Sequence, residues 1–71
     1  MARAQYKTAQ IILSSEWDST KQMWRPAAVV TYIKSNKMDD QQISSEDLFS
    51  TVEEANAHAK TLAERWVDEH L

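Results

Sequence analysis

The chain has 71 residues, of which 42% are hydrophobic and 27% charged, and its formal net charge is −3 at pH 7. This is the composition of one small globular domain spanning residues 1–71 rather than of a disordered chain. The absence of cysteine excludes a disulfide framework and thiolate metal sites, and the absence of glycine excludes the usual phosphate-binding and dinucleotide-binding loops.

The first strand is predicted from Gln5 to Trp17, where β-branched, aromatic and aliphatic residues dominate. The continuous apolar run at residues 11–13 indicates that both faces of this strand are partly buried. The polar residues from Asp18 to Lys21 suit a type I turn. We therefore expect the chain to reverse there and form a hairpin.

The second strand of this hairpin is predicted from about Gln22 to Lys34, centred on the apolar segment 28–33. Pro26 cannot donate a ladder hydrogen bond, so we expect it near a strand end, at a bulge, or facing solvent. A turn over residues 35–40 follows. Because the chain lacks glycine, we expect positive φ angles at asparagine or aspartate, with Asn36 as the best candidate.

Residues 41–49 have two interpretations. A short third strand around residues 41–45 could continue with a bulge toward Phe49. Alternatively, the segment could be an irregular connection that carries Leu48 and Phe49 into the core. The pattern leaves open whether this segment pairs with the sheet.

The last third of the chain predicts one amphipathic helix. Thr51 suits the N-cap position, and Glu54 three residues later completes a Thr-x-x-Glu capping box. Apolar residues then recur at helical spacing. They are Val52, Ala55, Ala59, Leu62 and Trp66, with Ala63 and Val67 widening the stripe. The alanines allow the helix axis to lie close to a sheet, and Trp66 is expected to fill the far end.

Together these elements predict an α+β fold. A two- to three-stranded antiparallel sheet, connected as a meander, is expected to carry the C-terminal amphipathic helix on one face. The other face of the sheet has no predicted partner within the chain. That uncovered face is therefore the first place to look for function.

Four short motifs occur between residues 6 and 68. They are Tyr6-Lys7, Trp24-Arg-Pro26, Phe49-Ser-Thr-x-Glu-Glu-Ala55 and Ala63-x-x-Trp66-Val-Asp68. In these motifs the chain resembles a family of small, mostly proteobacterial, uncharacterised domains of two or three strands followed by a helix, although it lacks the turn glycines of the usual members. The resemblance implies this fold and a bacterial protein, and because the family has no established activity it implies no function.

The residues that could carry chemistry form no catalytic or metal-binding pattern. His58 and His70 lie roughly 18 Å apart along a helix, so they cannot share a metal within one chain. The spacing of Glu54 and His58 permits a pair on the helix surface. The acidic residues at positions 39, 40, 46 and 47 match no cation-binding loop. We therefore predict a protein that is not an enzyme and holds no metal or cofactor.

Aromatic and basic residues on the predicted hairpin form the candidate interaction surface. They are Tyr6, Lys7, Trp17, Trp24, Arg25, Tyr32 and Lys34. An uncovered sheet face with tryptophans is typical of protein interfaces, and a chain this short gains stability by burying one. The first prediction is therefore a protein-interaction module, homodimeric through this face or through an exposed edge strand.

The alternative prediction is that the basic hairpin contacts nucleic acid. Residues 1–37 carry a charge balance of +4, whereas residues 38–71 carry −7. Aromatic residues interleaved with basic ones on a sheet can stack on and neutralise single-stranded nucleic acid. The acidic overall charge argues against this use, because nucleic-acid-binding domains are usually basic.

The chain also lacks the features of exported and membrane proteins. Its first residues, Met-Ala-Arg-Ala-Gln-Tyr-Lys, contain no apolar run of the signal-peptide type. No segment approaches the run of about 18 apolar residues that a membrane-spanning helix needs. We therefore expect a soluble cytoplasmic protein without a membrane partner.

Overall fold

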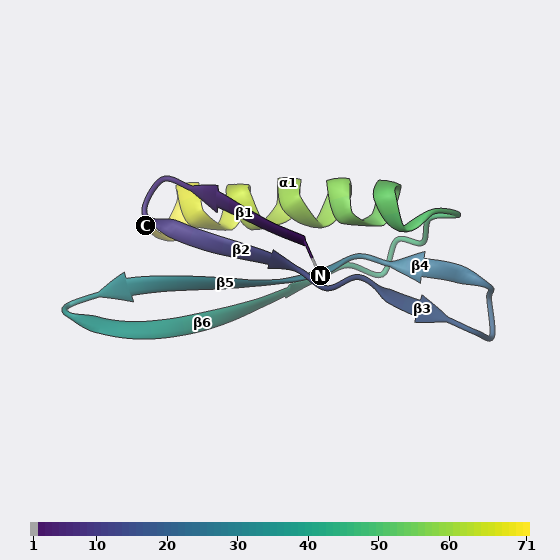
Figure 1. The fold of residues 1–71 in the computed structure, drawn as a ribbon, viewed down its shortest axis with the longest axis horizontal. Coiled ribbons are helices and arrows are strands. Elements are labelled where there is room, and N and C mark those ends of the chain that lie inside the picture. Colours follow the sequence, from purple (N-terminus) through teal and green to yellow (C-terminus); the bar gives the residue numbers. More distant parts are fainter. Residues whose placement is uncertain (1) are drawn as a thin grey trace.

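The computed structural model describes residues 2–71 and consists of strands followed by one C-terminal helix (Figure 1). The strands are β1 Ala2–Tyr6, β2 Ala9–Leu13, β3 Glu16–Asp18, β4 Met23–Arg25, β5 Ala27–Lys34 and β6 Lys37–Ser44, and the helix is α1 Val52–His70. The predicted α+β class is confirmed. The molecule is elongated, measuring 41 × 18 × 16 Å.

The strands form two antiparallel sheets rather than the one small sheet that was predicted. The larger sheet has four strands in the order β1-β2-β5-β6, and β3 pairs with β4 in the smaller sheet. Strands β3 and β4 extend the β2–β5 hairpin beyond an interruption of the ladder at Pro26 and at Ser14 and Ser15. Pro26 therefore lies between two strand ends, as its missing N–H predicts.

The prediction of a single strand from Gln5 to Trp17 is wrong. The chain reverses at Lys7 and Thr8, so that Tyr6 pairs with Ala9 and β1 runs antiparallel to β2. Lys7 has a positive φ of 55°. A turn that has neither glycine nor asparagine at its positive-φ position gives no recognisable signal in the sequence. The sequence pattern therefore did not predict this hairpin.

Positive φ angles also occur at the other hairpin loops. Asn36 has φ 63°, as predicted, and Ser35 before it has φ 54°. Two successive positive φ angles are those of a type I′ turn, which joins β5 directly to β6 at Lys37. The turn is thus shorter than the predicted 35–40 segment. The expectation that only asparagine or aspartate would take positive φ is wrong at Lys7, Gln22 and Ser35.

The segment 41–49 combines features of both interpretations. Its first residues belong to β6, which pairs with β5 along its whole length and is longer than the predicted third strand. After Ser44 the chain is irregular, and Phe49 then forms an isolated bridge with Trp24, with backbone N–O distances of 2.7 and 2.9 Å. The bridge fixes the start of the helix against β4.

The predicted helix and its N-cap are confirmed. The Thr51 hydroxyl oxygen accepts a hydrogen bond from the backbone N–H of Glu54 at 3.2 Å. The Glu54 carboxylate accepts from the hydroxyls of Thr51 and Ser50, at 3.0 and 3.2 Å. The second half of the capping box therefore uses side-chain hydroxyls.

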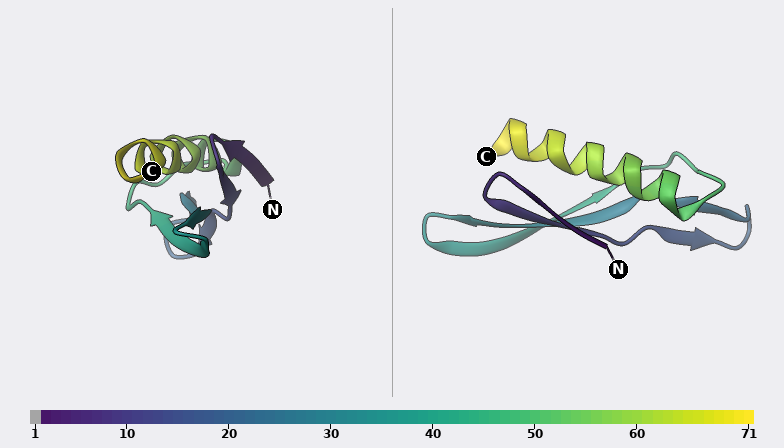
Figure 2. Two further views of the ribbon diagram at one scale, coloured as in Figure 1. Left: turned by 90° about the vertical axis from the view of Figure 1, so that its left-hand side faces the viewer. Right: turned by 45° about the horizontal axis from the view of Figure 1, so that its top comes forward.

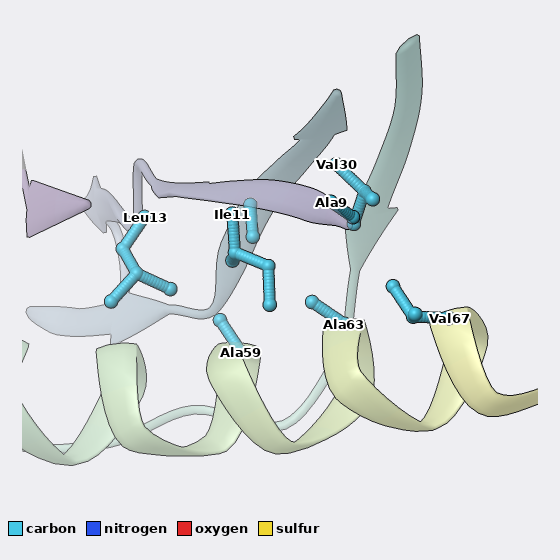
Figure 3. Close-up of a cluster of buried hydrophobic side chains, with 8 residues drawn as sticks. Ala9, Ile11, Leu13, Val30, Ala59, Ala63 and Val67 are labelled. Atoms are coloured by element: carbon cyan, nitrogen blue, oxygen red, sulfur yellow. The ribbon is translucent and has the colours of Figure 1, made fainter. Parts of the chain in front are cut away.

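Helix α1 lies on one side of the sheet (Figure 2). Its buried residues are Ala55, Ala59, Ala63 and Val67, spaced by four. The last three of these face Ala9, Ile11, Leu13 and Val30 of the sheet (Figure 3). Trp66 is only partly buried and flanks this seam, so the alanines rather than the tryptophan set how closely the helix approaches.

Candidate interaction surface

The strand register defines which side chains lie opposite helix α1. Residues paired directly across neighbouring strands point to the same face of a sheet, and alternate residues point to opposite faces. Because Ile11 and Val30 face the helix, the residues on either side of them face away from it. We call this side the uncovered face. It comprises Arg3 and Gln5 of β1, Gln10 and Ile12 of β2, Ala27, Val29, Thr31 and Ile33 of β5, and Met38, Asp40, Gln42 and Ser44 of β6.

The uncovered face exposes large apolar side chains. Ile33 and Met38 lie directly opposite each other and are 66% and 72% exposed. Ile12 and Val29, also a direct pair, are half-buried. No element within residues 2–71 covers the face on which these four apolar side chains lie. An exposed apolar patch of this kind is typical of an interface.

Between the two apolar pairs runs a polar row. Gln10 of β2 pairs with Thr31 of β5, which in turn pairs with Asp40 of β6. The Thr31 hydroxyl donates to the Asp40 carboxylate at 3.0 Å. This side-chain bond across the strands fixes the carboxylate on the uncovered face, while Arg3 lies at the far edge on β1.

A hollow of about 300 Å³ lies at the end of the uncovered face nearest to the smaller sheet. Here Ala27 is opposite Ser44, so two small side chains meet. The hollow is also lined by Val29, Gln42 and Glu16. The surface is hollow here because these two small side chains are surrounded by larger ones.

The structure distributes the aromatic residues of the sequence-predicted surface over different parts of the molecule. Tyr6 and Tyr32 point to the helix side, where both pack against the core. The Tyr32 ring lies 5.3 Å from the ring of Trp66. Trp17 and Trp24 instead meet edge to face on the smaller sheet, with ring centroids 5.3 Å apart.

The basic residues of that set are also separated. Lys7 forms an ion pair with Asp68 of the helix, whereas Arg25 pairs with Asp18 at 3.0 Å. Lys34 lies at the tip of the β5–β6 hairpin. Arg25 borders the hollow of the uncovered face, whereas Lys34 alternates with Ile33 and lies on the helix side, so the seven residues do not form one continuous surface. Their role in binding stays a prediction.

Hydrogen bonds and charges around the Asp68 carboxylate shift the pKa values of Asp68 and of the two side chains that contact it. The Lys7 ammonium and the Tyr6 hydroxyl, which both donate to Asp68, lower the pKa of its carboxyl. The same bonds raise the pKa of Lys7 and of Tyr6. Lys7 and Asp68 are exposed and Tyr6 is half-buried, and in this arrangement each group stabilises the ionisation state of the others.

His58 has a different partner from the one its sequence spacing suggested. Its Nε2 lies 3.4 Å from the Asp47 carboxylate and its ring lies 5.2 Å from that of Phe49. Glu54 is engaged at the N-cap instead. Among residues 2–71, histidines and acids do not gather into a group of three that could hold a metal.

Sequence reasoning missed the apolar residues of the uncovered face. One signal for them was present, because the run Ile11–Leu13 indicated burial on both faces of its strand. In β5 three of the four residues on each face are apolar or aromatic, so their alternation did not show which side the helix would cover.

No protein-family model, curated protein or solved structure matches this chain. The family resemblance over residues 6–68 therefore stays a prediction. Within residues 2–71 no helix is both long enough and apolar enough to cross a membrane.

Proposed function

We propose that this protein is a non-enzymatic interaction domain that forms a homodimer through the uncovered face of its larger sheet. The observation that carries the proposal is the exposure of the directly paired Ile33 and Met38, at 66% and 72%. Burying these side chains against a second copy would remove them from water, which stabilises an interface by roughly 25 cal/mol per Å² of apolar surface.

The small size of the core supports self-association. Of the nine buried hydrophobic residues in the described part of the chain, five are alanine: Ala9, Ala28, Ala55, Ala59 and Ala63. Alanine buries little apolar surface, and a single core in a chain this short supplies only about 3–5 kcal/mol. A second buried layer on the other side of the sheet would add to it.

The positions of the aromatic residues favour a protein partner over nucleic acid. Sheets that bind single strands stack bases on aromatic side chains of the open face. On the uncovered face, the described side chains include no aromatic residue, and they carry Arg3 and Asp40 as one charge of each sign. Nucleic-acid binding is therefore the second candidate and an explicit outcome of the test.

The test is size-exclusion chromatography with light scattering on protein that has not been treated with nuclease. Absorbance is recorded at the wavelengths where nucleic acid and protein absorb most strongly, so that bound nucleic acid is detected. We expect the wild type to elute as a dimer without nucleic acid and the double variant Ile33→Ser/Met38→Ser to elute as a folded monomer. The matched control is Leu71→Ser, because Leu71 is also an exposed apolar residue, at 47%, but lies at the end of the helix. It should leave the dimer intact.

Two results would overturn the proposal. One is a wild-type protein that is monomeric at every concentration tested, and the other is a dimer that survives the double substitution. A monomer that carries nuclease-sensitive absorbance would favour the nucleic-acid alternative.

A further inference from the structure

The two ends of the uncovered face have complementary shapes. At the tip of the β5–β6 hairpin, Ile33 and Met38 project, whereas at the other end Ala27 and Ser44 border the hollow of about 300 Å³. Both pairs lie on the same two strands, six residues apart, which is about 20 Å at 3.3 Å per residue. One molecule thus carries a protrusion and a recess on one face.

Building on the proposed homodimer, we infer that the uncovered faces of its two copies pack against each other around a two-fold axis. This axis lies between the two sheets, parallel to their planes, and crosses the strands at right angles at the level of Val30. This operation places Ile33 and Met38 of each copy over the recess at Ala27 and Ser44 of the other. Both recesses are filled at once, which is what a two-fold interface requires. The partner of the uncovered face is accordingly a second copy in this orientation.

The intervening residues are compatible with this arrangement. The same axis places Thr31 over Val29 of the second copy and Asp40 over Gln42 of the second copy. The Asp40 carboxylate, an acceptor, therefore meets an amide that can donate, and the two Asp40 side chains do not oppose each other.

The competing two-fold axis, parallel to the strands between β5 and β6, fits less well. It would stack Ile33 on Met38 of the second copy and would leave Ala27 over Ser44 of the second copy. Two small residues facing each other leave a void, and voids cost binding energy because their lining loses its contacts.

The uncovered face occupies only part of the 41 Å length of the molecule, because β5 and β6 are eight residues long, about 26 Å at 3.3 Å per residue. A face of about 26 × 18 Å corresponds to roughly 470 Å² per copy, which places the proposed dimer among small, weaker interfaces.

Crosslinking with single-cysteine variants tests the orientation. The chain contains no cysteine, so Met38→Cys and Ser44→Cys each introduce one reactive thiol. After the dimer has been verified by light scattering, each variant alone and an equimolar mixture are treated with a bismaleimide that bridges facing sheets, about 10 Å apart. We expect a crosslinked dimer chiefly in the mixture.

The outcomes separate the orientation from the dimer itself. Efficient crosslinking of Met38→Cys alone, or a dimer in which the mixture does not crosslink, would overturn the orientation and leave the homodimer standing. A wild-type protein that is monomeric would overturn both the orientation and the homodimer. The crosslink cannot form within one chain, because positions 38 and 44 are about 20 Å apart along one strand.

Filling the recess provides a second test. Ser44→Trp places a large side chain at an exposed position of the edge strand β6, where it leaves the core untouched, and we expect it to yield a folded monomer. Ala57→Trp on the exposed side of helix α1 is the control and should remain dimeric. A dimer that tolerates Ser44→Trp would contradict the proposed orientation.

Discussion

The hydroxyl of Tyr6 donates to both carboxylate oxygens of Asp68, at 2.9 and 3.0 Å, and joins the first hairpin to the last turns of helix α1. Lys7 of the same hairpin forms an ion pair with that carboxylate. These contacts span more than 60 residues of sequence, and they tie down β1, an edge strand that is paired on one side only. This cluster gives the fold a defined dependence on pH.

Asp68→Asn should lower the midpoint of urea unfolding at neutral pH and have less effect in acid. Lys7 and Tyr6 hold the pKa of Asp68 below its usual value. Its contribution to stability is therefore fully present above the unfolded pKa, about 3.9, and is lost as the pH falls through the lower folded pKa. Urea unfolding of wild type and variant from neutral to acidic pH measures the difference. A difference that stays constant with pH would contradict this linkage.

Tyr6 should titrate above its ordinary pKa because its hydroxyl donates to the Asp68 carboxylate. The stability from this bond is present below the unfolded pKa, about 10, and is lost as the pH rises through the raised folded pKa. In a Tyr32→Phe background Tyr6 is the sole tyrosine, so ultraviolet absorbance reports its ionisation. Adding Asp68→Asn should return the pKa toward the ordinary value, and no change on this addition would refute the assignment.

Thr51→Ala should destabilise the protein by about 1 kcal/mol, because it removes the acceptor for the Glu54 backbone N–H at the helix start. Equilibrium unfolding in urea, followed by circular dichroism, measures the loss. Ser50→Ala is the matched control, since the Ser50 hydroxyl donates only to the exposed Glu54 carboxylate. Equal losses for the two variants would show that the backbone bond is not the source of the effect.

Ala59→Leu should destabilise the protein by at least about 1–3 kcal/mol, the usual cost of overpacking a core. Ala59 is fully buried where helix α1 lies against Ile11 of the sheet (Figure 3). Ala57→Leu makes the same change on the exposed side of the same helix, so it should leave the free energy of unfolding nearly unchanged. Thermal and urea unfolding of both variants compare the sites. If Ala59→Leu were tolerated as well as Ala57→Leu, the helix would not lie as close to the sheet as described.

Ser35→Gly should raise the free energy of unfolding by about 1 kcal/mol, because Ser35 has φ 54° and glycine removes the steric cost of that conformation. Ser19→Gly is the control in the other loop, where the backbone has no positive φ at that position. It should be neutral or slightly destabilising, since glycine there only adds freedom to the unfolded chain. A stabilisation shared by both variants would rule out relief of local strain.

The features that the sequence predicts correctly are those encoded by neighbouring residues. Thr51 and Glu54 form the cap of a helix whose alanine spacing places it against a sheet, and both were evident from short patterns. Asn36 marked one hairpin turn for the same reason. The turn at Lys7 was missed because neither of its residues is a turn former, and it exists because β1 gains a ladder with β2.

The candidate surface depended on tertiary structure. Tyr6 and Tyr32 looked like residues of an open binding face, but helix α1 lies on their side of the sheet and they pack beneath it. Because both faces of β5 are mostly apolar, the sequence determined that a sheet and a helix would form, whereas only the packing decided which residues the helix covers. It covers the alanine-rich side, where its axis can approach most closely, and this choice leaves Ile33 and Met38 exposed.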